Sequence, residues 1–461
     1  MEFVVGILLL LTFFGLAYYC IKGHNLMIGF LIITILWTAL SFLGAAFASP
    51  EFLSTTAFYS NGEPVKAIAI LNKIYQSAPE GWGTTLVNVC WGAWFGRVLM
   101  ETGIASTLIR KTVELGGDKP MVTIALLNIV TAIIFTAMTG AGPVIAIGVI
   151  VLPIMMSLGV PKAIAMFSFM ESVAAGIYLN PVNFAQYRAF FIDVDEMPNF
   201  TLGWYAGKWG YAALIISVVV TTILAGFFLK KSKTSHAWAA QTRGASEQKD
   251  APLYTLILPI VPVVLKIWLD FSVIGGFVIA GFAALFLCGK MKGSFKENCQ
   301  LVNKLYYDGV VDTAPLVGFL LTLPMFNSVA SYVSPFFKAV LGPVMPKSEL
   351  VVCILFAVLL ALGLFRGPMT LVGCGAATLG VLRGVASFSV PFLYCVFAIP
   401  TITVNIGSCI TQSWVAWGLA YTKVESKDYL KLSIPMTYIG GILLYILTFV
   451  TMSGLGAEWF V

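Results

Sequence analysis

One acidic residue, Glu171, lies deep within an apolar stretch of the sequence, eight residues into the run 163–179. An acidic side chain near the middle of a bilayer costs roughly 2.5–3.5 kcal/mol on insertion scales, so such residues usually serve transport. Because burial disfavours the ionised carboxylate, Glu171 can carry a proton, and it can also bind a cation. The alternatives are a purely structural pairing with another helix and a neutral Glu171 that pairs with nothing.

Two further apolar stretches are interrupted by Gly-Pro pairs, Gly142-Pro143 and Gly367-Pro368. Proline removes a backbone donor, and in a membrane the freed backbone groups must be satisfied by protein, water, an ion or a substrate. Helix N-termini at such a break would direct partial positive charge at an anion. Two kinked helices without a ligand are the alternative. The residues at the breaks that we assign to a substrate site are Thr139, Gly140, Gly142, Arg366, Gly367 and Thr370.

Arg366 is the strongest candidate for binding an anion, because a guanidinium group matches a carboxylate with two hydrogen bonds and stays charged. If the second break is a hairpin, Arg366 lies inside the protein. If 348–365 is a full span, Arg366 merely extends from its end toward the lipid headgroups.

Two asparagines, Asn180 and Asn405, each end an apolar run, and Asn183 and Ser408 follow them closely. Unwound backbone together with Asn and Ser oxygens can bind a carboxylate or a cation such as Na⁺. We therefore add these four residues to the substrate site, with Na⁺ near Asn180 and Asn405 as an option. An ordinary asparagine cap at each helix end is the alternative.

The elements that position these residues follow from composition. The chain has 461 residues, of which 59% are hydrophobic and 10% charged, against about 45–50% and 25% in soluble domains. This composition excludes a soluble enzyme, a disordered protein and a nucleic-acid-binding protein. At about 20 residues per span, it predicts an all-α polytopic membrane protein with about 10–12 transmembrane helices. The predicted spans are 3–21, 26–48, 82–100, 119–138, 163–179, 204–229, 252–269, 271–289, 308–326, 348–365, 390–405 and 431–452.

Four other segments are less regular. The Gly- and Pro-rich regions 139–158 and 366–383 are either full spans or parts of two re-entrant hairpins. The segments Gly103–Glu114 and Ser294–Lys304 carry periodic charges and are predicted as interfacial helices. Arg97 and Glu101, one turn apart, are interpreted as a surface pair, and Asp312 as a charge at a membrane boundary.

The chain also contains an internal repeat. Pro143 precedes Asn180 by 37 residues, and Pro368 precedes Asn405 by the same 37 residues. The repeat predicts a first half at 1–229, a cytoplasmic linker at 230–250 and a second half at 251–461.

The two halves are predicted to have opposite orientation. The strongest excesses of Lys and Arg lie in 230–250 and 290–304, which places both loops on the cytoplasmic side. The matched spans 82–100 and 308–326 then run in opposite directions. Inverted-topology repeats of this kind are typical of secondary transporters.

Two stretches resemble a known group of carriers. The run Trp94–Ala105, followed by Leu108-Ile109-Arg110, resembles gluconate permeases, and Leu152–Val160 resembles a segment shared by gluconate permeases and anaerobic C4-dicarboxylate carriers. Both belong to the ion transporter superfamily, whose members move organic anions or ions with H⁺ or Na⁺. The sequence lacks the paired Ser-Asn-Thr signature of sodium-dicarboxylate carriers, which leaves sodium coupling in doubt.

This resemblance implies an elevator-type architecture, with a dimerising scaffold domain and a mobile transport domain that contains two hairpins. The hairpins would map to about 120–158 and 346–383, and broken helices to the regions around 180 and 405. Spans 82–100 and 308–326 would belong to the scaffold.

The sequence therefore predicts a secondary active transporter of a small organic anion, a sugar acid or a di- or tricarboxylate, coupled to H⁺. Arg366 and the hairpin amides would bind the anion, and Glu171 would take the proton. A Na⁺-coupled carboxylate carrier and a cation/proton antiporter on the same fold are the alternatives. We expect a multi-pass protein of a bacterial inner membrane, its partners being the lipid bilayer and a second copy in a homodimer. Neither a cofactor nor an enzymatic activity nor a nucleic-acid partner is expected.

Overall fold

The computed structural model describes residues 2–21, 24–54, 56–60, 62–117, 119–191, 197–232, 250–342, 346–373 and 375–460. These residues are mostly helical, and a short antiparallel hairpin joins β1 (Tyr59–Ser60) to β2 (Glu63–Pro64). Most of the predicted linker, residues 233–249, lies outside the described residues, as does the acidic stretch 192–196.

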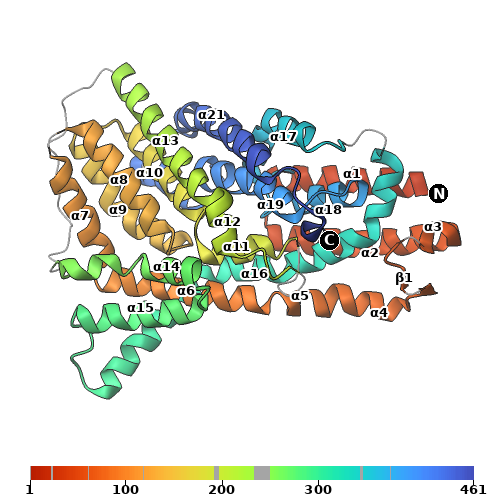
Figure 1. The fold of residues 1–461 in the computed structure, drawn as a ribbon, viewed down its shortest axis with the longest axis horizontal. Coiled ribbons are helices and arrows are strands. Elements are labelled where there is room, and N and C mark those ends of the chain that lie inside the picture. Colours follow the sequence, from red (N-terminus) through yellow and green to blue (C-terminus); the bar gives the residue numbers. More distant parts are fainter. Residues whose placement is uncertain are drawn as a thin grey trace.

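The N-terminal part of the chain contains the apolar helices α1 and α2. It continues to α6, which packs against α15 and α16. Figure 1 shows α7, α8 and α9 gathered at one end of the molecule and α1 to α3 at the other. The elements of this part are α1 (Glu2–Ile21), α2 (Leu26–Phe47), α3 (Pro50–Ser54), α4 (Ala67–Asn72), η1 (Lys73–Ser77), α5 (Ala78–Gly81), α6 (Gly83–Glu101) and α7 (Ile104–Gly116).

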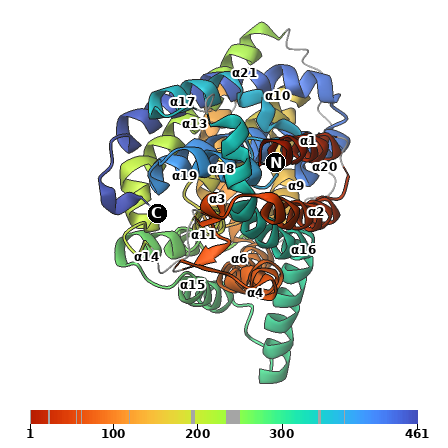
Figure 2. The ribbon, with the colours of Figure 1, turned by 90° about the vertical axis from the view of Figure 1, so that its right-hand side faces the viewer.

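The longest element is α16 (Phe295–Leu341), a helix of 47 residues that packs against α1, α2, α6 and α18. Figure 2 shows α1 and α2 side by side next to α16. The prediction of a separate interfacial helix at Ser294–Lys304 is wrong. A reciprocal cap between Ser294 and Glu297 starts the helix, and no proline or cap follows that would end it before the predicted span.

The first Gly-Pro pair lies at the start of a helix. After α8 (Pro120–Phe135) the chain leaves the helical path at residues 136–140, and α9 (Ala141–Ser157) begins just before Gly142-Pro143. The following α10 (Lys162–Ile177) is bent by 67° relative to α11 (Pro181–Arg188), with Asn180 at the break.

The elements of the second half follow one another in the same order as those of the first half. α17 (Glu349–Val358) is bent by 62° relative to η4 (Leu360–Arg366), and α18 (Gly375–Val385) follows after the second Gly-Pro pair. α19 (Val390–Ile399) continues into the π-helical η5 (Pro400–Ser408), and α20 (Ser413–Thr422) follows a break at 409–412. The remaining elements are α12 (Leu202–Tyr205), η2 (Ala206–Gly210), α13 (Tyr211–Lys231), η3 (Leu253–Ile257), α14 (Val261–Leu269), α15 (Val273–Leu287), α21 (Ser426–Met452) and η6 (Ala457–Trp459).

The described residues contain fewer full-length spans than the predicted 10–12. Four helical stretches are long and apolar enough to cross a membrane, or up to six if each bent pair counts as one span. The difference arises because apolar helices such as α8 and α9, with 16 and 17 residues, fall just short of the length that crosses a bilayer core about 30 Å thick. The full-length stretches are Met27–Phe47, Leu202–Lys231, Val390–Thr422 and Ser426–Met452.

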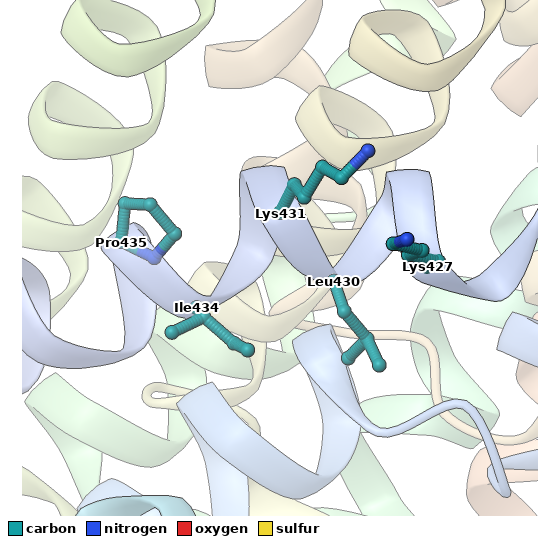
Figure 3. A pocket seen from close by; sticks show the side chains of 5 residues that line it. All are labelled: Lys427, Leu430, Lys431, Ile434 and Pro435. Carbon is teal, nitrogen blue, oxygen red and sulfur yellow. The ribbon is translucent and has the colours of Figure 1, made fainter.

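The outer face of α21 carries an open groove of about 590 Å³, lined by Lys427, Leu430, Lys431, Ile434 and Pro435. In Figure 3, Lys431 extends to one side of the helix, and Leu430 and Ile434 extend to the opposite side. The Lys431 ammonium donates to Asp428 at 2.7 Å. The groove is separate from the predicted site residues, which lie in the interior.

Candidate functional site

The predicted site residues surround an interior cavity of about 710 Å³, to which both halves of the chain contribute. Thr139, Gly140, Asn183, Arg366 and Asn405 all line it. The other residues of its wall are His24, Asn25, Met27, Phe135, Ala141, Val144, Val173, Ile177, Gln186, Tyr187, Asp312, Thr313, Ala314, Gly318, Val372, Ile406, Thr411, Gln412, Ser413 and Trp414.

The break between α8 and α9 is held in place by Asn180, which does not itself line the cavity. Its Nδ2 donates to the carbonyl oxygens of Phe135 and Met138, both at 3.0 Å, at the end of α8. Its Oδ1 accepts from the backbone N–H groups of Val182 and Asn183, at 3.0 and 3.3 Å. Asn180 therefore caps α11 and satisfies the carbonyls that the break sets free.

Glycine is required at the tip of this break for two different reasons. Gly140 has a φ of +96°, a conformation that side-chain-bearing residues rarely adopt. Gly142 lies so close to the Asp312 carboxylate that a Cβ atom there would overlap it. The tip of α9 therefore packs directly against α16.

The second break presents Arg366 to the cavity from a left-handed backbone conformation. Phe365 and Arg366 have φ values of 56° and 57°, which for residues other than glycine cost about 1–2 kcal/mol each. The Phe365 N–H donates to the Cys409 sulfur at 3.1 Å, and the Arg366 guanidinium donates to Gln412 Oε1 at 3.4 Å. The end of η4 is thus tied to the break between η5 and α20.

Two asparagines that line the cavity, Asn405 and Asn183, have unsatisfied polar atoms. Asn405, in η5, is fully buried and lines the cavity, and neither its Nδ2 nor its Oδ1 has a hydrogen-bond partner. Asn183 is 6% exposed; its Nδ2 donates to the Tyr187 hydroxyl at 3.3 Å, and its Oδ1 has no partner. Polar atoms of this kind are rarely left unsatisfied in a protein interior, and both side chains belong to the cavity wall.

Glu171 lies behind the cavity wall. It is 1% exposed, and its Oε1 accepts a hydrogen bond from Ser408 Oγ at 2.7 Å. Its Oε2 is buried without a partner, beside Gly407, where an added Cβ would overlap the carboxylate. The Gly407 carbonyl accepts a hydrogen bond from the Tyr429 hydroxyl. Glu171 is thus connected to the cavity through η5, the same segment that carries Asn405.

One charged pair of the site was missed by the sequence analysis. Arg97 on α6 donates from Nε and Nη2 to the two carboxylate oxygens of Asp312 on α16, both at 2.6 Å. The predicted pair of Arg97 with Glu101 is wrong, since Glu101 bonds Lys290 instead. Asp312 also lines the cavity, which was not predicted.

The remaining predicted residues lie near the cavity without lining it. Gly142 packs on Asp312 as described. Thr370 Oγ1 donates to the Gly363 carbonyl at 2.8 Å, and Ser408 contacts Glu171 and also Thr437, at 3.2 Å. Gly367 packs closely on the Leu362 carbonyl. In the part of the chain that the structure describes, no group of three His, Cys, Asp or Glu residues could hold a metal ion.

Comparison with known families tests the resemblance to carriers that the sequence suggested. Residues 92–292 match the family model described as DcuC, the C4-dicarboxylate anaerobic carriers. The resemblance to anaerobic C4-dicarboxylate carriers is thereby confirmed over this segment, which contains both stretches quoted for it. The matching family is one of carriers and not of enzymes. No curated protein matches the sequence.

Solved structures with a similar fold are also transporters. MtrF of Neisseria gonorrhoeae, from a class described as antimetabolite efflux pumps, has a TM-score of 0.59 and 13% identity over 94% of this chain and 96% of its own. The Alcanivorax borkumensis transporter YdaH has a TM-score of 0.50 and 15% identity over 93% of this chain and 99% of its own. At these identities the similarity concerns the fold. The protein is thus a helical, multi-pass membrane protein with a transporter fold.

Proposed function

We propose that this protein is a secondary active transporter of a small organic anion, a sugar acid or a di- or tricarboxylate, coupled to H⁺. The observation that carries the proposal is the cavity of about 710 Å³ where the breaks of both halves meet, with Arg366 and Asn405 on its wall. The family match of residues 92–292 supports an organic anion as the substrate.

The anion-binding role falls to Arg366. Its guanidinium contacts Gln412 at the long distance of 3.4 Å, which a carboxylate oxygen can replace with a shorter, charge-assisted bond. The hydroxyl groups of Thr139 and Ser413 and the amide of Asn405 line the same cavity. These groups can bind the polar remainder of a sugar acid or carboxylate.

The proton-coupling role falls to Glu171. Its Oε2 is buried, and among the described residues it has neither a hydrogen-bond partner nor a positive charge beside it. The side chain is therefore more stable as a neutral carboxyl than as a carboxylate. Protonation alters the hydrogen bond to Ser408, and η5 carries both Ser408 and Asn405. Proton binding and substrate binding are therefore coupled through one short segment, which is what a symporter requires.

The transport movement is proposed to be of the elevator type, on an inverted-topology repeat. Bent and broken helices follow in the same order in the two halves, and this supports the repeat. The mobile domain would contain the breaks that line the cavity, with hairpins at about 120–158 and 346–383 and broken helices around 180 and 405. The scaffold would contain α6 and α16, which pack against each other. The proposal also includes that the protein forms a homodimer in a bacterial inner membrane.

The test is uptake of radiolabelled carboxylates and sugar acids into proteoliposomes with an imposed pH gradient. We expect accumulation driven by a gradient that is alkaline inside, and its loss when a protonophore removes that gradient. A gradient of Na⁺ that drives uptake at equal pH would instead favour sodium coupling, in which Glu171 and the Ser408 hydroxyl bind the ion. Proton flux in response to Na⁺, without any organic anion, would contradict the proposal in favour of a cation/proton antiporter.

A further inference from the structure

Asn405 presents an amide with two empty hydrogen-bonding positions to the cavity. The side chain is fully buried, and among the described residues neither Oδ1 nor Nδ2 has a partner. Because neither atom is bonded, rotating the amide by half a turn gives the same result. Asn405 therefore offers an acceptor oxygen and an NH2 group with two donors to whatever occupies the cavity.

The backbone around Asn405 holds the amide in this position. The neighbouring carbonyl of Ile406 accepts a hydrogen bond from Trp414 Nε1 at 3.0 Å. Thr403, two residues earlier, contacts the Tyr178 hydroxyl at 2.8 Å. Because η5 is fixed on both sides of Asn405, the amide is preorganised for a ligand.

Other acceptors on the cavity wall also require donors from the ligand. Asn183 Oδ1 is buried without a partner. The Asp312 carboxylate lies on the wall with Arg97 bonded to both of its oxygens, and each carboxylate oxygen can accept a further bond. Neither of these groups can be satisfied by a carboxylate of the substrate, which only accepts hydrogen bonds.

We infer that this carrier selects carboxylates that bear hydrogen-bond donors, hydroxyl or amide N–H groups, over donor-free carboxylates of the same length. The inference rests on the proposed function and specifies its substrate class. The substrate carboxylate bonds Arg366, and a hydroxyl or N–H group of the substrate donates to Asn405 Oδ1. A donor-free acid such as succinate fills the same space but leaves Oδ1 unpaired.

The size of the expected preference follows from the cost of an unpaired buried acceptor, which corresponds to about 10- to 100-fold in Kd. Sites built to bond a substrate hydroxyl discriminate strongly against the analogue that lacks it. We therefore expect malate to bind at least about tenfold more tightly than succinate, and tartrate no more weakly than malate.

The experiment measures Kd by calorimetry for the matched acids malate and succinate, and lactate and propionate, with the purified full-length protein. In the Asn405→Leu variant, which keeps the size of the side chain, the preference for each hydroxy acid should fall by about tenfold or to no preference. The matched control is Asn128→Leu. Asn128 is an equally buried amide on α8 that donates to Thr222 and accepts from Ser168, and its replacement should leave the preference unchanged.

The outcomes separate the inference from the proposed function. Equal affinity for malate and succinate in the unmodified protein, or a preference that Asn405→Leu leaves undiminished, overturns the inference alone. If neither these acids nor any sugar acid or tricarboxylate in the uptake assay binds or is transported, the proposed function fails as well. If Asn405→Leu does not fold, the ratios measured with the unmodified protein still decide the matter.

Discussion

Arg97 and Asp312, which are 215 residues apart in the sequence, form a doubly hydrogen-bonded ion pair directly beside Gly142. The pair joins α6 to α16, and the tip of α9 packs on its carboxylate. Gly96, next to Arg97, also lies against Pro143. One charged contact thus holds two packed helices together and forms the surface on which the first break rests.

The first prediction concerns this ion pair. Asp312→Asn keeps the shape of the side chain but removes its charge and replaces one acceptor oxygen by an NH2 donor. One of the two bonds from Arg97 is therefore lost, the other is weakened, and Arg97 loses its counter-charge. We expect a loss of about 2 kcal/mol in stability, measured as a lower thermal midpoint in detergent. A double-mutant cycle with Arg97→Gln should show coupling between the two positions. Additive effects would mean that the pair contributes little.

The second prediction concerns the contact between Gly142 and Asp312. Gly142→Ala introduces a Cβ that overlaps the carboxylate, so either the tip of α9 or the ion pair must shift. We expect a marked loss of transport in proteoliposomes and a lower thermal midpoint. The control is Gly15→Ala on the exposed face of α1, where an added Cβ meets nothing within 4 Å. Because alanine is the better helix former, that change should be neutral or stabilising.

The third prediction concerns the coupling group. Glu171→Gln mimics the neutral carboxyl permanently, so proton-driven accumulation should be lost, while exchange of labelled for unlabelled substrate persists. The initial rate of exchange should then no longer depend on pH between about 5 and 8. An unchanged pH dependence of transport in this variant would remove Glu171 from the coupling mechanism.

The fourth prediction concerns the first break. Asn180→Ala leaves the Phe135 and Met138 carbonyls without their donor and removes the cap of α11. Each unsatisfied buried group costs about 1–3 kcal/mol, so we expect a loss of stability of at least about 2 kcal/mol. Since Asn180 does not line the cavity, the Kd for a bound acid should change less than in Asn405→Leu. A reversed order of these two effects on Kd would contradict the geometry.

Matched spacing indicated two regions whose residues line one cavity, but it did not distinguish the roles within them. Asn180 and Asn405 follow their Gly-Pro pairs at the same distance, yet the first satisfies protein carbonyls and the second faces the cavity without a partner. Only the surrounding backbone makes this difference, because α8 ends beside Asn180 and exposes free carbonyls to it. A single sequence contains no trace of that proximity.

Asp312 was missed for a related reason. It lies near the predicted start of a span, where charges usually mark the membrane surface, and its partner Arg97 had a nearer candidate in Glu101. The helix also begins earlier than the predicted span, because α16 starts at Phe295 and continues past Asp312 without a break. Local periodicity can predict that a helix exists, but neither its full extent nor its partner follows from that pattern.

The length of α16 also allows depth in the membrane to be measured along this one helix. A helix of 47 residues is about 70 Å long at 1.5 Å per residue, well beyond the thickness of a bilayer. Spin labels at its exposed positions Phe295, Tyr307, Val311 and Leu321 would report immersion depth at known positions along the path of the helix. Such a depth profile would locate the water–lipid boundaries on α16 and, through it, the level at which Asp312 and the cavity lie.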